Sequence, residues 1–276
     1  MAAGNRSIPP ATISRGVAKA IRLWPLLTAT QRYEKIVSTR NRGHGVYIEA
    51  PILAYLIETP QGRILYDVGC DYRKIADPAL RAQFLEPMRP LFEPPVMDES
   101  QRIPNYLARL GLSVRDIDLV FLGHLHFDHA GGLCDLPGCE VHVHADELAA
   151  FAGGGYDGVF ADEMAGSASF RQQRGEYDVA PGVRAITSPG HTAGHMSLFI
   201  ELPKGPPVIL CGDAADLVEN LDHEIAPGAC WQEDEALALA SIRKLKALAL
   251  REKAELWPNH DLAFFWAQAP FPRWRE

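Results

Sequence analysis

One short segment of the sequence carries the residue types that hold metal ions. Residues 123–129 read Gly-His-Leu-His-Phe-Asp-His and follow a short apolar run. Side chains two residues apart in an extended chain point to the same side, so His124 and His126 face one way. A turn after them can bring Asp128 and His129 to the same point, and imidazole nitrogens and carboxylate oxygens are natural ligands of divalent metals. Core packing explains such a group poorly because buried polar groups need partners, so we predict a metal site here.

Three more polar residues follow apolar runs of the β type later in the chain. They are His191 in Pro-Gly-His, Asp213 in Cys-Gly-Asp and His260 in Pro-Asn-His. Functional side chains tend to lie on loops that a rigid scaffold holds, and the end of a strand provides such a place. With the first segment these residues supply seven ligand groups, which is too many for one tetrahedral ion and about right for two. Spacing alone does not decide between His191 and the nearby His195.

The elements that must position these residues are strands interleaved with helices. Apolar runs bounded by turn residues predict the strands, and helical periodicity or an Ala/Leu-rich composition predicts the helices. The order of elements lacks the regular alternation of a doubly wound sheet, which favours sheets covered by helices in layers. The predicted strands are 52–57, 64–66, 118–122, 139–144, 183–187, 196–202, 207–211 and 256–257, and the predicted helices are 103–110, 146–151 and 233–251.

Two long connections interrupt this order. Residues 70–100 are rich in proline, arginine and bulky apolar side chains. A long irregular connection of this kind favours a packed lid or a binding loop, whose apolar side chains would either line a substrate pocket or fill a core. Residues 153–174 begin with three glycines and are predicted to form a second, mobile loop.

The composition is that of one globular domain. The chain has 276 residues, 47% of them hydrophobic, with a net charge of −8, and it is long enough to bury a sizeable core. We predict a flexible N-terminal arm over residues 1–16 and a single domain over residues 17–276. No apolar stretch is long enough to span a bilayer, and the arm lacks the apolar centre of a secretory signal. Five cysteines without a disulfide spacing agree with a cytoplasmic protein.

The charge balance argues against nucleic acid as a partner, because proteins that bind it usually carry a basic patch. The richest basic run, Arg243-Lys244-Leu245-Lys246, lies on the predicted helix 233–251. We interpret this run as a solvated helix face. A small-molecule substrate is compatible with the acidic balance.

Three phrases together resemble the metallo-β-lactamase superfamily. They are His-Leu-His-Phe-Asp-His-Ala-Gly-Gly at 124–132, Pro-Gly-His-Thr-Ala-Gly-His-Met-Ser-Leu at 189–198 and Gly-Asp-Ala at 212–214. Within the superfamily, the chain is similar to the N-acyl-homoserine lactone lactonases, in order from about residue 50 to about residue 261. The resemblance implies an α/β fold, an αββα sandwich in which two mixed sheets pack together and are flanked by helices. A homodimer is suggested by the resemblance and by no other feature of the sequence.

The resemblance also assigns the ligands of two divalent metal ions. One ion takes His124, His126 and His191, the other takes Asp128, His129 and His260, and Asp213 bridges the two. Zinc suits this mixture of nitrogen and oxygen ligands, and iron, cobalt or manganese can occupy such sites. His195 is then expected to support the site from outside or to be structural. His142 and His144 share one face of a predicted strand, and we interpret both as structural.

Two metal ions in such a site can hold a hydroxide that attacks the carbonyl carbon of a lactone. Asp128 is the candidate catalytic residue, which would pass a proton to the departing alkoxide; the alternative is a role as a ligand only. Phe127 is predicted to contact the substrate or to pack beneath the loop. The lactonases of this family usually have a tyrosine three residues after the bridging aspartate, whereas this chain has Asp216. An ionised carboxylate cannot donate a hydrogen bond as tyrosine does, so Asp216 is predicted either to contact the substrate in another way or to face solvent.

The favoured function is ring opening of N-acyl-homoserine lactones, which are bacterial quorum signals. The nearest alternative is hydrolysis of another small lactone, a thioester or a cyclic amide. A glyoxalase II-like thioesterase would need basic residues near the C-terminus, where residues 264–274 are rich in aromatic side chains. The acidic charge disfavours a phosphodiesterase or nuclease of the same fold. His126 and the lack of a flavin domain disfavour a flavodiiron oxidoreductase, and the complete ligand set disfavours a non-catalytic binding protein.

Overall fold

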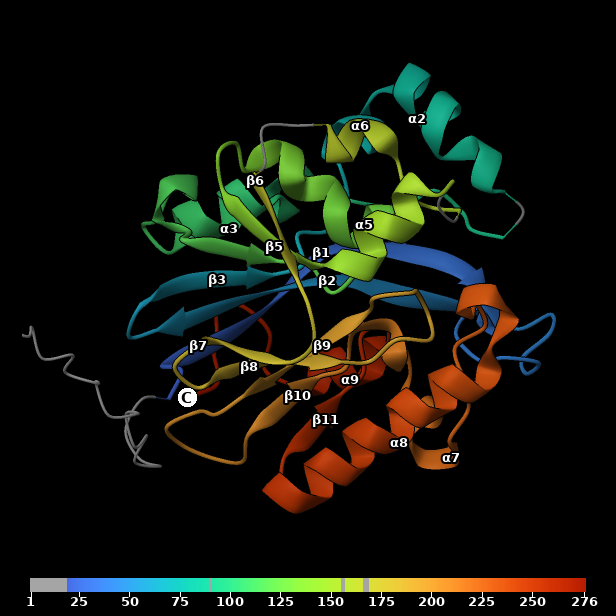
Figure 1. The fold of residues 1–276 in the computed structure, drawn as a ribbon. Helices are drawn as coiled ribbons and strands as arrows, with labels where there is room; N and C mark the ends of the chain where they lie inside the picture. The colour runs from blue at the N-terminus through green and yellow to red at the C-terminus, as the bar shows by residue number, and fades with distance from the viewer. Residues whose placement is uncertain (1–18, 90, 155–156, 166–168) are drawn as a thin grey trace, which may run out of the picture.

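Two β-sheets lie face to face at the centre of the molecule, with helices on both outer sides (Figure 1). The computed structural model describes residues 19–89, 91–154, 157–165 and 169–276, so the predicted arm over residues 1–16 lies outside the described residues. Among the described residues, no helix is both long enough and apolar enough to cross a membrane.

The first sheet has the strand order β1-β2-β3-β4-β5-β6. The pairs β1–β2 and β2–β3 are antiparallel, whereas β3–β4, β4–β5 and β5–β6 are parallel. The sheet is therefore mixed, as predicted. Its strands are β1 (Arg22–Glu34), β2 (Tyr47–Thr59), β3 (Gly62–Tyr66), β4 (Leu119–Phe121), β5 (Glu140–His144) and β6 (Ser169–Gln173).

The second sheet has the strand order β11-β10-β9-β8-β7. Only β10–β11 is parallel among its pairs, so this sheet is mixed as well. Its strands are β7 (Tyr177–Ala180), β8 (Val183–Thr187), β9 (Met196–Ile200), β10 (Val208–Leu210) and β11 (Glu255–Trp257).

The helices form the outer layers. On the side of the first sheet lie α1 (Tyr72–Ala76), α2 (Pro78–Phe84), α3 (Ile103–Arg109), α4 (Phe127–Ala130), α5 (Ala145–Ala152) and α6 (Ala161–Met164). On the side of the second sheet lie α7 (Val218–His223) and α8 (Glu235–Glu252). Helix α9 (Leu262–Ala267) instead contributes Phe265 to the apolar layer between the sheets.

Alternation along the strands builds three apolar layers. Tyr66 of β3 packs between the sheets with Leu198 of β9, whereas its neighbour Leu65 packs with Leu107 of α3 on the outer face. Ile209 of β10 similarly faces α8. Successive side chains of a strand point to opposite faces, so a strand covered on both faces is apolar throughout. The αββα sandwich predicted from the sequence is confirmed.

Most predicted elements are present with bounds shifted by a residue or two, except that β2 begins five residues before the predicted strand 52–57. The predicted hairpin 52–57 and 64–66 is β2 paired with β3, and the predicted helix 103–110 is α3. Gly111 after α3 has φ +72°, a left-handed conformation that glycine commonly adopts at the end of a helix. The predicted helix 233–251 is α8.

The interpretation of the two long connections as irregular was wrong in part. Residues 70–100 contain α1 and α2, and residues 153–174 contain α6 and the sheet strand β6. Strands β1 and β7 were not predicted. β1 is buried along most of its length on both faces and so lacks a clear alternation, while β6 and β7 are polar edge segments with few buried side chains.

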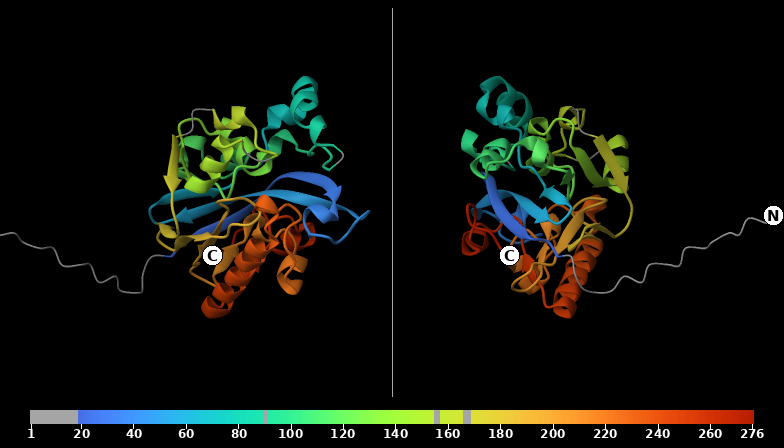
Figure 2. Two further views of the ribbon diagram at one scale, coloured as in Figure 1. Left: turned by 45° about the vertical axis from the view of Figure 1, so that its right-hand side comes forward. Right: turned by 90° about the vertical axis from the view of Figure 1, so that its left-hand side faces the viewer.

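The β1–β2 hairpin extends past the first sheet and its tip lies beside the segment that precedes α8 (Figure 2). The tip contacts this segment through Gly228 N, which donates to Val37 O at 2.9 Å, and through an ion pair between Lys35 and Glu219. A Cβ on Gly228 would lie 1.9 Å from Ile36 O, so only glycine allows this approach. The hairpin tip is thereby fixed close to the loop that follows β10.

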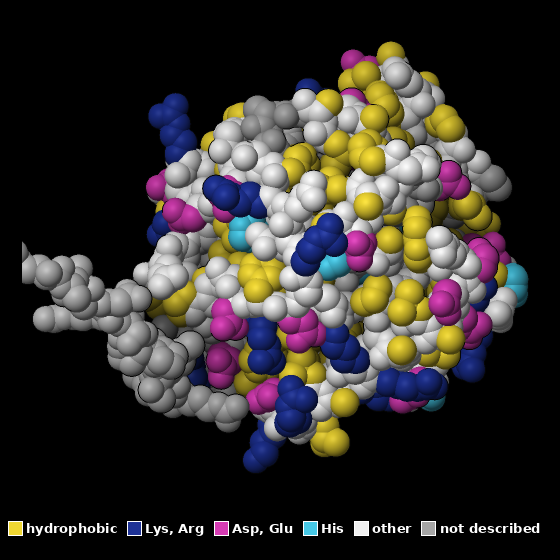
Figure 3. Space-filling view, viewed as in Figure 1, with side chains coloured by type: hydrophobic (Ala, Val, Ile, Leu, Met, Phe, Trp, Pro, Cys, Tyr) yellow, Lys and Arg dark blue, Asp and Glu magenta, His cyan; other side chains and the backbone are white. Residues whose placement is uncertain are grey.

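The basic run on α8 is paired with acidic side chains. Arg243 and Lys246 both contact Glu224, at 2.8 and 3.1 Å, and Lys244 Nζ lies 2.7 Å from Glu176. Figure 3 shows this face of the molecule with positive and negative side chains interspersed. The run is therefore a charge-balanced helix face.

Candidate metal centre

The predicted ligands lie on loops that follow four strands. His124 and His126 follow β4, His191 follows β8, Asp213 follows β10 and His260 follows β11. Asp128 and His129 lie in the short helix α4, which begins directly after His126. Seven side chains that are spread over 137 positions of the chain thus come together at one edge of the sandwich.

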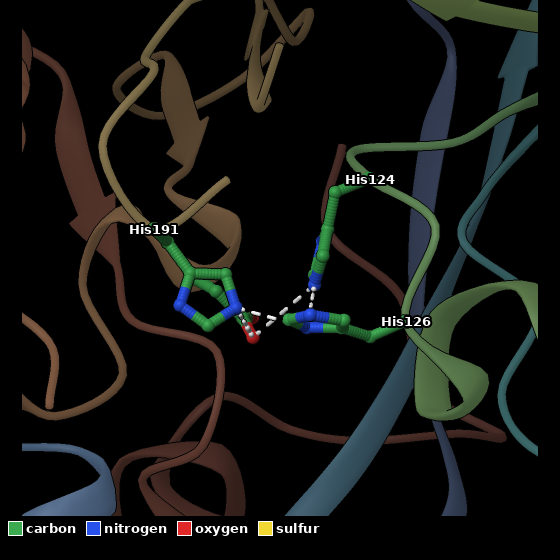
Figure 4. Close-up of side chains that lie close together, drawn as sticks. His124, His126 and His191 are labelled. Atoms are coloured by element: carbon green, nitrogen blue, oxygen red, sulfur yellow. Dashed lines mark hydrogen bonds and ion pairs between the residues drawn. The ribbon is translucent and has the colours of Figure 1, made fainter. Parts of the chain in front are cut away.

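Three imidazoles and one carboxylate form the first group. In Figure 4 the rings of His124, His126 and His191 point toward one another. His126 Nδ1 lies 2.9 Å from His124 Nε2 and 3.0 Å from His191 Nε2. Asp213 Oδ2 lies 3.4 Å from His191 Nε2 and 3.6 Å from His124 Nε2.

The second group contains the other predicted ligands and shares the same aspartate. Asp213 Oδ1 lies 3.3 Å from His129 Nε2 and 3.2 Å from His260 Nε2. Asp128 Oδ2 lies 3.5 Å from His129 Nε2 and 3.8 Å from His260 Nε2. One oxygen of Asp213 therefore faces each group, which is the arrangement expected of a bridging ligand.

The separations between these atoms fit metal coordination. Ligand atoms about 2.0–2.2 Å from a tetrahedral zinc ion lie roughly 3.3 Å from one another. The separations of 2.9–3.8 Å in the two groups are close to this value. His129 Nε2 is buried and has no hydrogen-bond partner among the described residues, as expected for an atom that binds a metal.

The outer nitrogens of three rings are held by acceptors, which fixes the inner nitrogens as lone-pair donors. His129 Nδ1 lies 2.7 Å from Asp67 Oδ2, His260 Nδ1 donates to Pro51 O at 2.8 Å, and His191 Nδ1 donates to Ala229 O at 3.2 Å. Histidines that bind metals almost always donate their other N–H in this way. The residues present therefore fit two divalent ions.

The electrostatics of the two groups differ. Burial lowers the pKa of His126 to about 3 and lowers the pKa values of His124 and His191. These rings are therefore neutral and able to bind metal at physiological pH. Burial also disfavours the charged form of His260, but Asp213 and other carboxylates outweigh it and raise the pKa of His260 to about 10. A metal ion in the second group would compete with a proton, so its binding would release protons.

Two glycines let the ligand loops approach their neighbours. A Cβ on Gly132, which follows the first histidine motif, would lie 2.1 Å from Val68 O. Gly190 has φ +141°, and a Cβ there would lie 2.4 Å from Ala238 Cα in α8. These contacts hold the loop of His129 against β3 and the loop of His191 against α8.

A family model described as the metallo-beta-lactamase superfamily matches residues 48–260, which include all seven predicted ligands. The chain belongs to the metallo-beta-lactamase superfamily. Curated members similar to it include an N-acyl homoserine lactonase of Bacillus sp, 34% identical over 79% of this chain and 84% of that protein. The lactonase AttM of Rhizobium radiobacter is 29% identical over 87% of this chain and 93% of its own length.

Solved structures of superfamily members agree with this assignment. An N-acyl homoserine lactone hydrolase, described with the product N-hexanoyl-L-homoserine at its catalytic metal centre, matches with a TM-score of 0.82. It is 28% identical in sequence, and the match covers 93% of this chain and all of the other. AidC, described as a dizinc quorum-quenching lactonase, shares the fold with a TM-score of 0.62 at 17% identity.

The three other histidines considered from the sequence, His142, His144 and His195, lie outside the two ligand groups. His195 is fully buried, contacts Ser188 Oγ through Nδ1 at 2.9 Å and accepts from Asp213 N through Nε2 at 3.0 Å. It thus positions the backbone of the shared aspartate, which agrees with a supporting role. His142 contacts Tyr177 Oη and Glu140, and His144 accepts a hydrogen bond from Asp146 N, as expected of structural residues.

Phe127 and Asp216 are both buried. Phe127 packs with Phe160, their ring centroids 5.7 Å apart, so the packing role considered from the sequence is present. Asp216 is 4% exposed, which contradicts the alternative that it faces solvent. Whether either side chain touches a substrate stays a prediction. Burial raises the pKa of the neighbouring Cys211 thiol to about 12, so this side chain is a buried thiol and not a nucleophile.

Several residues that hold the metal centre in place were not predicted from the sequence. Asp67 follows β3, contacts His129 Nδ1 and accepts from Gly123 N at 2.8 Å. Its position at a strand end was a signal that could have identified it. Glu147 of α5 accepts from Gly194 N at 2.7 Å and so holds the His191 loop, but nothing in its local sequence marks this contact.

Proposed function

We propose that this protein is a hydrolase that uses two divalent metal ions to open the lactone ring of N-acyl-homoserine lactones. The convergence of seven ligand side chains into two groups that share Asp213 carries this proposal. Similarity to curated N-acyl homoserine lactonases over most of the chain supports the choice of substrate. Zinc is the favoured metal because the ligands combine imidazole and carboxylate.

Bound divalent ions would supply Lewis acidity and an activated water. The chain supplies the frame that holds them, since Asp67 orients the His129 ring and His195 fixes the backbone of Asp213. Ring opening also needs a proton on the departing alkoxide. This proton must come from a group at the mouth of the site.

Asp128 is the best placed group to move that proton. Its side chain is 13% exposed, whereas those of Asp213 and His260 are each 6% exposed, so it reaches furthest toward solvent within the second group. A carboxylate in this position can accept a proton from water and pass it to the leaving oxygen. We therefore propose that Asp128 acts both as a ligand and as a proton shuttle.

An apolar cluster beside Asp128 is the proposed support for the acyl chain. Phe127 packs with Phe160, and Phe84 and Met88 of the 70–100 segment pack against the same cluster. These packed side chains would also keep water away from the metal centre. Excluding water strengthens the electrostatic interactions inside such a site. Leu91 of the same segment is exposed and offers further apolar surface. We propose that Phe127 forms the floor of the substrate site at this point.

We also propose that the protein acts in the cytoplasm on a small molecule. All five cysteines are unpaired, as is usual in a reducing compartment. The acidic net charge and the paired basic side chains of α8 support a substrate other than nucleic acid.

The test is proton release from short-chain and long-chain N-acyl-homoserine lactones by protein loaded with metal. Opening the ring forms a carboxylic acid, which ionises at neutral pH. We expect Asp128→Asn to lower the rate by at least about 100-fold, within the usual range for loss of a general acid or base. The exposed Asp222 provides a matched control, and Asp222→Asn should leave the rate unchanged.

Metal content is measured in each variant alongside the rate. Asp128→Asn protein that retains both metals and loses turnover would support the proton role, whereas loss of one metal would limit Asp128 to ligation. A wild-type protein that holds two metals and opens none of these lactones would refute the proposed substrate. Other lactones, thioesters and cyclic amides would then be tested.

A further inference from the structure

Asp216 is a buried carboxylate beside the second group of ligands. It follows a short 3₁₀ helix, Gly212–Ala214, that carries Asp213. A carboxylate oxygen of Asp216, an oxygen of Asp213 and a ring nitrogen of His260 all lie within 4.8 Å of one another. His260 N also donates to Asp216 O at 2.8 Å, which ties the backbone of the two ligand loops together.

One oxygen of this carboxylate is without a partner. Asp216 Oδ1 is buried and has no hydrogen bond to any described residue. Such an atom loses its hydration on burial and gains nothing in return unless a cation or a donor reaches it. No lysine or arginine forms an ion pair with Asp216 among the described residues.

The hairpin tip holds Asp216 in this position from the other side. The Ser38 side chain hydrogen-bonds Asp216, and Tyr33 Oη lies 2.9 Å from Ser38 Oγ. The backbone of Ser38 is fixed in turn, because its carbonyl accepts from Asn220 Nδ2 at 2.8 Å. Hydroxyl groups arranged in this way donate toward a carboxylate, which acts as an acceptor when ionised.

Three carboxylates thus lie around His260, namely Asp128, Asp213 and Asp216. Like charges in a buried site repel one another strongly unless a cation lies between them. The first group contrasts with this arrangement, since it has three imidazoles and only the shared Asp213. A divalent ion in the second group would relieve both the repulsion and the unpartnered oxygen.

Building on the proposed two-metal site, we propose that Asp216 is an additional ligand of the metal ion held by Asp128, His129, His260 and Asp213. This position then has three carboxylates and two imidazoles, whereas the other has three imidazoles and one carboxylate. Imidazole-rich sites suit zinc, and carboxylate-rich sites suit harder ions such as manganese. The two positions therefore differ in metal preference, with zinc in the imidazole-rich position and Mn²⁺ accepted in the carboxylate-rich one.

The test loads metal-free protein with one equivalent of Zn²⁺ and then titrates Mn²⁺, with bound metal measured by plasma mass spectrometry and electron paramagnetic resonance. The wild type should retain one zinc and bind one Mn²⁺. Asp216→Asn should bind Mn²⁺ at least 10-fold more weakly and keep its zinc. Asp222→Asn, which removes an exposed aspartate six residues later, should match the wild type.

Mn²⁺ affinity that is unchanged in Asp216→Asn would overturn the proposal. Thermal melting of each variant shows whether it folds. A second test, the electron paramagnetic resonance of Mn²⁺ bound to the wild type, needs no variant. Nitrogen couplings to the bound Mn²⁺ should come from two imidazoles, and couplings from three would place Mn²⁺ in the other position and overturn the assignment. No step uses a substrate, so a protein that binds the two ions as described but opens no lactone would refute only the proposed function.

Discussion

Two buried polar clusters lie close together in this molecule and differ in the source of their positive charge. The metal cluster consists of the seven predicted ligands, His124, His126, Asp128, His129, His191, Asp213 and His260. The lysine cluster consists of Lys74, Asp162, Glu163, Phe84 and Phe160. Phe160 belongs to the lysine cluster and also packs against Phe127, which lies between two metal ligands in the chain.

The lysine cluster supplies its own cation. Lys74 is 3% exposed, and its Nζ lies 2.8 Å from Glu163 Oε1 and 2.9 Å from Asp162. The same atom lies 4.2 Å from the ring centroid of Phe84 and 4.4 Å from that of Phe160. These contacts fasten α1 to α6, so the two long connections beside the metal cluster are joined to each other.

In the part of the chain that the structure describes, the carboxylates of the metal cluster form ion pairs with histidines and with no lysine or arginine. Its carboxylates and imidazoles converge on two points, where a divalent cation from outside the chain would take the place of protons on the histidines. Buried charges need partners in both clusters. In the lysine cluster a cation of the chain balances the carboxylates, and the cluster stabilises the fold. In the metal cluster that cation has to bind from solution, and such a site is suited to chemistry.

The largest effect is expected from Asp213→Ala, because this residue faces both metal positions. Loss of a group that only supports a ligand usually costs 10–100-fold in metal affinity, so loss of the shared ligand should cost more than about 100-fold. Metal content after dialysis, compared with the wild type, measures this change. Asp162→Ala in the lysine cluster is the matched control and should retain both metals, and equal retention by the two variants would contradict the distinction.

A smaller loss is expected from Asp67→Asn, which weakens the contact that orients His129. Asp67 has φ +54°, a conformation that asparagine tolerates, so the backbone should be preserved. We expect metal affinity to fall by about 10–100-fold, measured by competition with a chelator. Asp71 is another buried aspartate on the same segment, where it caps α1. Asp71→Asn should lower stability slightly and leave metal affinity intact, so an equal metal loss in both variants would argue against the role of Asp67.

The two clusters also differ in how far the sequence predicted them. Each metal ligand carries a local signal, either the spacing of 124–129 or a place at the end of an apolar run, and all seven come together as predicted. Lys74 and Glu163 are 89 positions apart, with no spacing that links them. Their pairing depends on how two long connections fold over the first sheet, which neither periodicity nor turn residues specify.

The same limit applies to Asp216 and its surroundings. The sequence identified Asp216 because it departs from the family pattern, but it left a solvent-facing position open. The buried position depends on Ser38, which belongs to a hairpin tip that is distant in the chain. The strands were predictable where alternation or an apolar run was clear, as in β8, and not where a strand is buried on both faces, as in β1.

Lys74→Met is expected to destabilise the fold without removing metal. Above about pH 8, where Glu163 is ionised, removing one partner of this buried ion pair leaves the other charge uncompensated and costs about 3–5 kcal/mol. The second change Glu163→Leu should recover a large part of this loss in the double variant. Urea unfolding measures both effects, and Lys244→Met on α8 is the control, because an exposed pair contributes about 1 kcal/mol or less. A metal loss in Lys74→Met as large as that in Asp67→Asn would mean that the two clusters are not separate in function.

The smallest effect concerns the pH dependence of stability. Burial raises the pKa of Glu163 to about 8 even though Lys74 lowers it. The folded protein therefore keeps a proton on Glu163 at pH values where the unfolded chain, with an ordinary glutamate pKa of 4.5, has released it. Unfolding then releases this proton, so the contribution of Glu163 to stability falls as the pH rises from about 4.5 to about 8, by at most about 1.4 kcal/mol per pH unit. Glu163→Gln should flatten this part of the stability profile in urea unfolding. An identical slope in the variant would show that Glu163 is ionised in the folded protein, because its contact with Lys74 outweighs the effect of burial.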